Sequence, residues 1–233
     1  PIKSSAASDV YKRQPWKALT MKNKWTQYFL ILLREWGLFI LFITFFLLTR
    51  LFLWLPVQVD GHSMDPTLAN NQRVIVLKHT SIERFDIVVA KEVEDGKTKQ
   101  IVKRIIGMPG DTITYQNDKL TVNGKEVKEE YLKEFQAAFA KDKLQKEYAY
   151  NDDKSKSGYF QQLAKDAKAF TTNADGNTTF SVTVPEGKYF LLGDNRIVSK
   201  DSRVVGYFDK SALVGEVKFR FWPINKIGTV EDN

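Results

Sequence analysis

Cysteine is absent from the 233-residue sequence. Without thiols the chain cannot form disulfide bonds, use a thiolate nucleophile or build a cysteine-ligated zinc site. The absence does not decide between a reducing and an oxidising compartment, so an extracytoplasmic location remains compatible with it. Histidine is nearly absent as well, with His62 and His79 as the two examples. This scarcity leaves little material for a mechanism that depends on histidine.

A strong excess of one charge sign is also missing. The formal net charge is +7, and the first twenty residues, which show no recognisable organisation before Met21, contribute four basic side chains against Asp9. We expect residues 1–20 to be a non-native leader, which leaves a net charge of +4 for the remainder. Without a concentrated basic patch this charge does not indicate nucleic-acid binding, so we expect no nucleic-acid partner.

The chain has one long hydrophobic run and no second one. The run extends from Trp36 to Leu55, reads WGLFILFITFFLLTRLFLWL and contains Arg50 as its single charge. About 20 such residues cover about 30 Å of hydrocarbon, so we expect a transmembrane helix over residues 36–56. A cleaved signal peptide would have a shorter apolar core followed by small residues, and a core helix of a soluble protein is disfavoured by the length of the run.

Basic residues precede this run. Lys22, Lys24 and Arg34 outnumber Glu35, and such a bias usually marks the cytoplasmic side. We therefore expect residues 21–35 to form a short cytoplasmic, juxtamembrane segment and residues 57–233 to be extracytoplasmic. The expected protein is a single-pass protein of the cell membrane that contacts membrane lipid.

Beyond the run the sequence is rich in short strand-like segments. Its length suits one domain with an insertion, and turn residues such as Asn123-Gly124 separate the segments, a strong signal for a two-residue hairpin. The expected strands lie at 73–77, 85–90, 100–106, 112–115, 120–122, 179–184, 188–192 and 214–221. This pattern predicts a mainly β, antiparallel domain formed by residues 57–127 and 178–233.

Residues 128–177 have a different character. Tyr131, Phe135 and Phe139 recur at helical spacing, and Phe160 begins a second such pattern after the polar stretch NDDKSKSG. We interpret this region as a helical insertion in the β domain. Its nearly balanced charges favour a solvated face over a binding surface.

Ser63, in the stretch VDGHSMDPTL, is a candidate nucleophile that needs a base. His62 is its immediate neighbour and would point to the opposite face of an extended segment, while His79 lies in the polar stretch KHTSIER. A Ser-His-Asp triad is therefore improbable. A lysine can replace histidine if burial keeps its amine neutral, by lowering its pKa from about 10.4.

Lys103 is the candidate for such a buried lysine. In the run QIVKRIIGMPGD it would share one strand face with Ile101 and Ile105, while Arg104 lies on the other face. The pattern alone leaves a second interpretation open, because the amine of a strand lysine usually reaches solvent.

Four segments together resemble the type I signal peptidase family of bacteria, in particular its Gram-positive members. They are GHSMDPTL around Ser63, RVIVLK followed by RFDIVVA, IVKRIIGMPGD around Lys103, and LLGDNRIVSKDSRVVG over residues 191–206. They occur in the order of the family, after a single membrane segment, and together cover nearly all of the β domain. The resemblance implies a mainly β fold of the signal-peptidase type and a serine endopeptidase that cleaves signal peptides from exported preproteins after small residues, at A-x-A sites.

The resemblance also implies roles for individual residues. Ser63 would be the nucleophile and Lys103 the general base, with Ser199 orienting the lysine. Positions that would brace the site by ion pairs are Asp194, Asp201, Arg203 and Arg104, and Gly193 and Asn195 would shape the loop. No metal and no organic cofactor is implied.

This sequence departs from the family pattern at two places in the candidate site, and a further set of residues would line a substrate pocket. Some family members have a serine two residues before the nucleophile that donates to the oxyanion. This chain has Gly61 there, so the backbone N–H of Ser63 would carry more of that task, and Ile197 and Val198 replace a polar pair in the loop. Residues whose position beside the dyad suggests substrate-pocket walls are Val59, Met64, Leu68 and Ile101.

Two rival functions are compared with this one. A self-cleaving repressor with a serine-lysine core would carry a DNA-binding module in place of the membrane segment, and residues 36–55 argue against it. A non-enzymatic, membrane-anchored extracellular binding or assembly module would retain the fold but tolerate loss of Ser63 or Lys103. For the peptidase, the expected partners are preproteins, membrane lipid and protein export machinery nearby.

Overall fold

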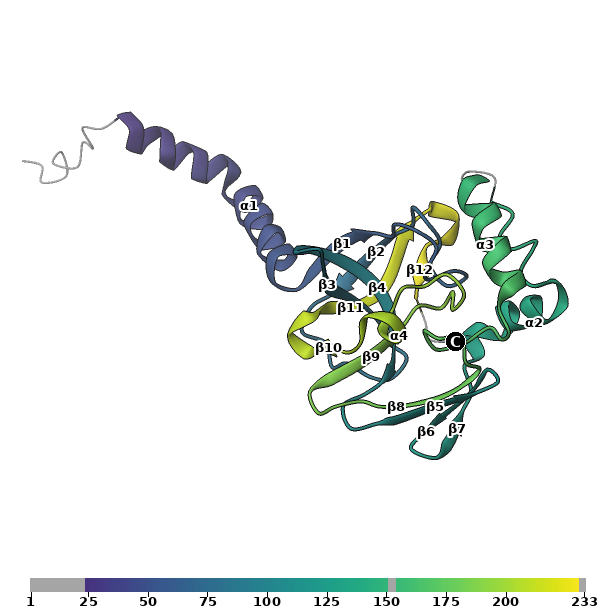
Figure 1. Ribbon diagram of the computed structural model, residues 1–233. Helices are drawn as coiled ribbons and strands as arrows, with labels where there is room; N and C mark the ends of the chain where they lie inside the picture. The colour runs from purple at the N-terminus through teal and green to yellow at the C-terminus, as the bar shows by residue number, and fades with distance from the viewer. Residues whose placement is uncertain (1–23, 151–153, 231–233) are drawn as a thin grey trace, which may run out of the picture. The chain divides into compact units, whose positions relative to one another are not determined.

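The computed structural model describes residues 24–150 and 154–230 (Figure 1). The expected leader, residues 1–20, and the first residues of the expected juxtamembrane segment lie outside the described residues. The described chain consists of two units, which meet in sequence after Leu48. Each unit is described by itself.

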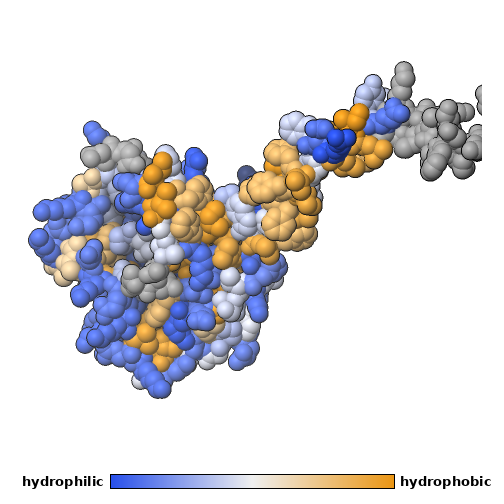
Figure 2. All heavy atoms as spheres, turned by 180° about the vertical axis from the view of Figure 1, so that it is seen from behind, coloured by the Kyte–Doolittle hydropathy of each residue, from blue (hydrophilic) through white to orange (hydrophobic). Residues whose placement is uncertain are grey.

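The first unit contains most of helix α1, Lys24–Phe52. Within this helix, Gln27–Phe52 is long and apolar enough to cross a membrane. Figure 2 shows hydrophobic side chains over much of its visible surface. The helix begins before the expected segment because residues 28–33, YFLILL, are themselves apolar and contain no helix breaker.

The expected membrane segment ended at residue 56, whereas α1 ends at Phe52 and residues 54–56 lie in strand β1. In β1, Pro56 pairs with Ile75 of strand β2, and Leu55 and Val57 pack against a buried cluster. An edge strand tolerates proline because one side of its backbone needs no ladder hydrogen bond. The apolar run therefore continues past the helix into the core of the second unit.

The second unit contains two antiparallel sheets and short helices. Its elements are β1 (Trp54–Gln58), β2 (Arg73–Leu77), β3 (Ile87–Glu94), β4 (Lys97–Gly107), β5 (Thr112–Gln116), β6 (Lys119–Val122), β7 (Lys125–Val127), η2 (Glu130–Leu132), α2 (Lys133–Asp142), α3 (Lys154–Asp166), β8 (Thr179–Thr183), β9 (Lys188–Leu192), α4 (Ser202–Val205), β10 (Phe208–Asp209), η3 (Lys210–Ala212), β11 (Leu213–Trp222), η4 (Ile224–Lys226) and β12 (Gly228–Thr229).

The larger sheet has the order β1-β2-β11-β3-β4-β9-β10, with β12 beside β11, and the smaller one has the order β7-β6-β5-β8. Every strand pair in both sheets is antiparallel. The mainly β, antiparallel fold class predicted from the sequence is thus confirmed. Its core consists of buried clusters on the faces of the two sheets, dominated by valine, isoleucine and leucine.

Two tight turns fix the strand registers. Asn123 and Gly124 both have positive φ, as the expected two-residue hairpin between β6 and β7 requires. Asp95 and Gly96 have the same conformation and join β3 to β4. The second turn sets the register that pairs Lys103 with Val88, and therefore decides where the lysine lies in the sheet.

Between β7 and β8 the chain forms α2 and α3 (Figure 1). Side chains of both helices and of the segments beside them form a buried cluster rich in aromatic residues. Phe135 and Phe139, one helical turn apart, are buried in it together with Tyr148 and Phe170. A helical conformation is thus observed within residues 128–177, where the sequence predicted it.

Candidate active site

Ser63 lies in the loop between β1 and β2. The loop is closed at its base, where Val59 N–H donates to the Gln72 carbonyl at 2.8 Å and Asn71 N–H donates to the Val59 carbonyl at 2.9 Å. Gly61, at φ +93°, makes the bend that precedes the serine, and its N–H donates to Asn70 Oδ1 at 2.9 Å. Ser63 is half-buried, so its hydroxyl is accessible although the loop is held in place.

Lys103 approaches Ser63 from strand β4. Its Nζ lies 2.8 Å from Ser63 Oγ, and the lysine is 4% exposed. Burial lowers the pKa of Lys103, and the negative charges of Asp201, Glu92 and Asp194 oppose this effect in part. The amine is therefore displaced towards its neutral, proton-accepting form.

The strand surroundings explain the burial. Ile105, on the same face of β4 as Lys103, packs in a cluster with Val88 and Leu191 from the strands on either side. The alternating pattern in the sequence predicted this face correctly. The amine is enclosed because the Ser63 loop lies against the place where a lysine side chain would otherwise reach solvent.

Arg104 and Asp194 form a buried ion pair behind the dyad. The guanidinium donates from Nε to Oδ1 at 2.9 Å and from Nη2 to Oδ2 at 2.8 Å, and both side chains are fully buried. The carboxylate also accepts a hydrogen bond from Thr67 Oγ1 at 2.6 Å. The pair connects strand β4 to the loop after β9, and through Thr67 to the loop that carries Ser63.

Asp201, at the end of the same loop, forms a second pair with Arg203 of α4. Arg203 donates to both carboxylate oxygens at 2.8 Å, and the Gly193 N–H donates to Asp201 Oδ2 at 3.0 Å. Burial alone would raise the pKa of Asp201, but Arg203 and these hydrogen bonds lower it overall. The anionic form is thus stabilised, and it holds the backbone at Gly193.

Ser199 and Gly193 lie against the nucleophile loop. A side chain at Gly193 would place a Cβ 2.4 Å from the Ser63 carbonyl oxygen and 2.2 Å from Ser199 Oγ, so only glycine fits there. The Ser199 hydroxyl is close enough to Asp201 to contribute to lowering that pKa. Among the described residues, however, it makes no hydrogen bond of good distance and angle, and thus none to Lys103.

A hollow of about 360 Å³ opens in front of the dyad. Of the expected wall residues, Val59, Met64 and Ile101 line it, whereas Leu68 does not and has no exposed surface. The residues that line it are Leu55, Pro56, Val57, Gln58, Val59, Asp60, Ser63, Met64, Val89, Gln100, Ile101, Val102 and Lys103.

The wall contributed by β1, residues 55–58, was not anticipated from the sequence. Its signal was the alternating order of Val57, Gln58 and Val59 after Pro56, which continues directly from the apolar run. The resulting groove is bordered by β1 on one side and by residues 100–103 of β4 on the other. An extended peptide chain fits a groove between two such strands.

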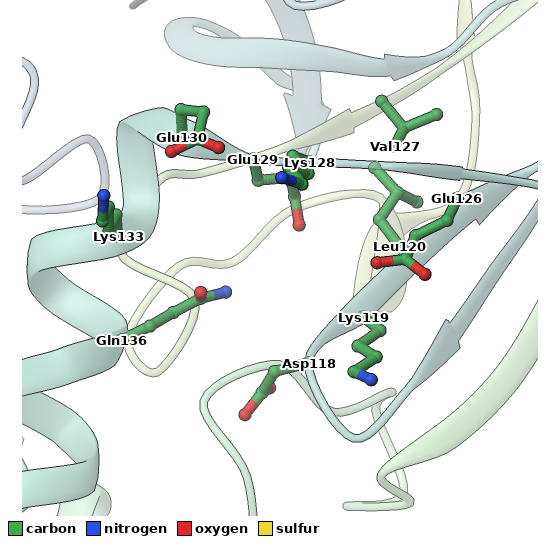
Figure 3. A pocket seen from close by; sticks show the side chains of 10 residues that line it. All are labelled: Asp118, Lys119, Leu120, Glu126, Val127, Lys128, Glu129, Glu130, Lys133 and Gln136. Carbon is green, nitrogen blue, oxygen red and sulfur yellow. The ribbon is translucent and has the colours of Figure 1, made fainter.

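A second hollow, of about 370 Å³, lies between the β6–β7 hairpin and the start of α2 (Figure 3). Its walls carry charges of both signs, and two of its carboxylates already have partners. Glu129 pairs with Arg196, and Asp118 accepts from the backbone N–H groups of Phe170 and Thr171. Its lining contains no hydroxyl or thiol side chain that could act as a nucleophile, so it does not offer the chemistry of the first hollow.

A serine hydroxyl within hydrogen-bond distance of a buried lysine, on an antiparallel β scaffold and beside an open groove, is the arrangement of a serine hydrolase with a lysine base. Residues 33–222 match the family model described as signal peptidase, peptidase S26. The chain therefore belongs to the signal peptidase family, and the class of enzyme predicted from the motifs, the serine endopeptidase signal peptidase I, is confirmed.

Several relatives are similar to this chain over most of its length. Signal peptidase I of Streptococcus pneumoniae (strain ATCC BAA-255 / R6) is 55% identical over 198 residues, which cover 84% of this chain and 96% of that protein. Signal peptidase IB of Staphylococcus aureus (strain N315) is 36% identical over 200 residues, which cover 83% and 92%. The crystal structure of a signal peptidase I from Enterococcus faecalis V583 matches with a TM-score of 0.40 and 28% identity, over 59% of this chain and 97% of that one.

Proposed function

We propose that Ser63 and Lys103 are the catalytic dyad of a membrane-anchored signal peptidase that cleaves signal peptides from exported preproteins. The observation that carries this proposal is the 2.8 Å distance between Ser63 Oγ and Lys103 Nζ, together with the lowered pKa of the amine. A neutral amine at this distance can accept the hydroxyl proton as the oxygen attacks.

The reaction is an acyl transfer in two steps. Lys103 takes the proton from Ser63 while Oγ attacks the scissile carbonyl, and it then returns the proton to the leaving amine. Water attacks the resulting ester with the same lysine as base, which releases the acid product and restores the serine. The chain's own side chains supply every proton transfer in this sequence.

The tetrahedral intermediate needs a hydrogen-bond donor for its oxyanion. Within the part of the chain that the structure describes, the backbone N–H of Ser63 makes no hydrogen bond. Gly61, which stands where some relatives of this family have a donating serine, has no side chain to offer. We therefore assign this role to the Ser63 N–H, which is held beside the hydroxyl it serves.

The groove suits an extended peptide with small side chains next to the cleaved bond. Val59, Met64 and Ile101 line the hollow beside the dyad and offer apolar surface to such side chains. This supports cleavage after an A-x-A sequence. The braces of the site are Arg104 with Asp194 and Arg203 with Asp201, and Ser199 lies against Gly193 in the loop beside the nucleophile.

Helix α1 would anchor the peptidase in the cell membrane, with the N-terminus cytoplasmic and the peptidase unit outside. The absence of cysteine gives a direct test, because single cysteines can be introduced without background labelling. Asp209→Cys, at an exposed position of the peptidase unit, should react with a membrane-impermeant maleimide in intact cells, whereas Asn23→Cys should react only after permeabilisation. The reverse pattern would overturn the orientation.

Cleavage of a preprotein by the full chain in detergent or lipid vesicles tests the dyad. Ser63→Ala and Lys103→Ala should each abolish cleavage, because neither an attacking oxygen nor a base remains. Ser211→Ala and Lys97→Ala, at exposed positions of η3 and of the same β4 strand, should cleave at the normal rate. Full cleavage by Ser63→Ala would show that Ser63 is not the nucleophile and would overturn the proposed dyad.

A further inference from the structure

The helical insertion and the nucleophile loop are connected through Asn195. The Asn195 N–H donates to the carbonyl of Ser63 at 3.1 Å, and its side-chain Nδ2 donates to the carbonyl of His62 at 3.0 Å. On its other side, Asn195 Oδ1 accepts a hydrogen bond from the hydroxyl of Tyr148, which belongs to the insertion. One fully buried asparagine, through its backbone N–H and its side-chain amide, thus links the insertion to the carbonyl groups on both sides of the Ser63 N–H.

The direction of these hydrogen bonds follows from the groups themselves. A backbone carbonyl can only accept, so the amide NH₂ of Asn195 must face His62 and its oxygen must face Tyr148. Tyr148 must then donate, which it can do only while protonated. Burial raises the pKa of Tyr148, so the phenol remains a donor.

A second contact between the insertion and the loop is made by Tyr150. Tyr150 donates its hydroxyl to Asp65 Oδ2 at 2.7 Å, and the same oxygen lies 2.9 Å from His62 Nδ1. The Tyr150 ring also stacks on the His62 ring, with centroids 4.0 Å apart. The insertion therefore holds both His62, immediately before Ser63, and Asp65, two positions after it.

The loop that carries Asn195 is itself packed on the insertion. Ile197 and Val198, which stand where a polar pair was expected, pack against the aromatic cluster around Phe135 and Phe170. Both side chains are half-buried, and their apolar surface adds to the packing between the loop and the insertion. The unusual pair in the sequence thus belongs to the same connection as Asn195.

From these contacts we propose that the insertion positions the nucleophile, with Tyr148, acting through Asn195, and Tyr150, acting through Asp65, as positioning residues for Ser63. This inference rests on the proposed role of Ser63. Small displacements of a reacting group cost large factors in rate. The hydrogen bonds from Asn195 to the His62 and Ser63 carbonyls fix the backbone at the nucleophile itself, in addition to the contacts at the base of the loop.

Removal of single hydroxyl groups tests the proposal. Tyr148→Phe should lower kcat for preprotein cleavage by about tenfold, the loss expected for one buried hydrogen bond, and leave KM within about twofold. Tyr150→Phe should lower kcat in the same way. Tyr159→Phe, the same change at an exposed position of α3, is the matched control and should leave kcat unchanged.

A double-mutant cycle tests whether Tyr148 acts through Asn195. If it does, the variant that combines Tyr148→Phe with Asn195→Ala should be no slower than Asn195→Ala alone, because the route is already broken. Losses that multiply in the double variant would overturn this route. Unchanged kcat in both Tyr148→Phe and Tyr150→Phe would overturn the whole inference, and this outcome does not depend on whether Asn195→Ala folds.

Two further measurements complete the comparison: the melting temperature of each variant and the activity of Ser63→Ala. A kcat loss that persists at a temperature where each variant is fully folded supports positioning, while a loss that vanishes there would indicate a stability effect and overturn the inference. If Ser63→Ala is inactive and Tyr148→Phe is not impaired, the inference fails and the dyad stands. If Ser63→Ala remains active, the dyad itself fails.

Discussion

Arg104 and Asp194 face each other through two parallel hydrogen bonds with no exposed atom on either side chain, directly behind the lysine that contacts Ser63. Such a pair must compensate the loss of hydration of both charges before it contributes to stability. Arginine suits this task because its planar group binds both carboxylate oxygens at once. The pair joins two segments, β4 and the loop after β9, that hold the two sides of the site.

Loss of one partner of this pair should be costly. Asp194→Asn leaves the buried charge of Arg104 uncompensated and should lower the free energy of unfolding by about 3–5 kcal/mol. Asp209→Asn, which breaks the surface pair with Lys188, should change it by less than about 1 kcal/mol. Urea unfolding of both variants measures the difference, and equal effects would contradict a special role for burial.

The pH dependence of cleavage should report Lys103. Its amine must be neutral to act as base, so kcat/KM should rise with pH through the pKa of Lys103 and reach a plateau above it. Because burial lowers this pKa, the rise should lie below the value of about 10.4 for a free lysine. A rate that continues to rise up to about pH 10.4 would contradict a buried base.

Substitution of Glu92 offers a way to change the pH at which kcat/KM rises. Its negative charge raises the pKa of Lys103 in opposition to burial, and it lies two residues from Ala90 on the strand that pairs with β4. Glu92→Gln should therefore shift the rise of kcat/KM to lower pH and leave the plateau unchanged. A profile identical to that of the parent chain would show that this charge does not reach the amine.

Lys103 should also reduce stability at neutral pH. Its folded-state pKa lies below its unfolded one, so the unfolded chain binds more protons between the two values and stability rises with pH across that window. At pH values below this window, the buried charged amine of Lys103 lowers the free energy of unfolding by its full amount. Lys103→Met should therefore abolish cleavage yet raise the melting temperature at pH 7 by a few degrees, and the gain should shrink as the pH approaches 10.

Local signals in the sequence predicted much of the fold and the central pair. Alternation around Lys103 predicted the buried face, and Asn123-Gly124 predicted a hairpin, because both depend on neighbours in the chain. Strand β1 was assigned to the membrane segment, since Trp54 and Leu55 are as apolar as the helix that precedes them. Hydropathy cannot separate a helix in lipid from an adjoining strand that packs in a core.

The sequence did not predict where individual side chains point or which distant residues they contact, for a different reason. Leu68 lies close to Ser63 in sequence, but the short turn that starts at Met64, with the Leu68 N–H donating to the Met64 carbonyl at 2.9 Å, directs its side chain into the core. The Tyr148 hydroxyl meets Asn195 across 47 positions. Neither proximity in sequence nor periodicity carries information about such contacts.

The close approach of Gly193 to the nucleophile loop can be tested by adding one methyl group. In Gly193→Ala the Cβ would lie 2.4 Å from the Ser63 carbonyl oxygen, so the loop must move away and Ser63 must leave its position beside Lys103. We expect kcat to fall by about a hundredfold or more. Gly158→Ala, at a position in α3 with no heavy atom within 4 Å of the added carbon, should cleave normally. Preprotein cleavage measured on both variants tests this prediction. A fully active Gly193→Ala enzyme would contradict it, because cleavage would then not require the close approach of Gly193 to the nucleophile loop.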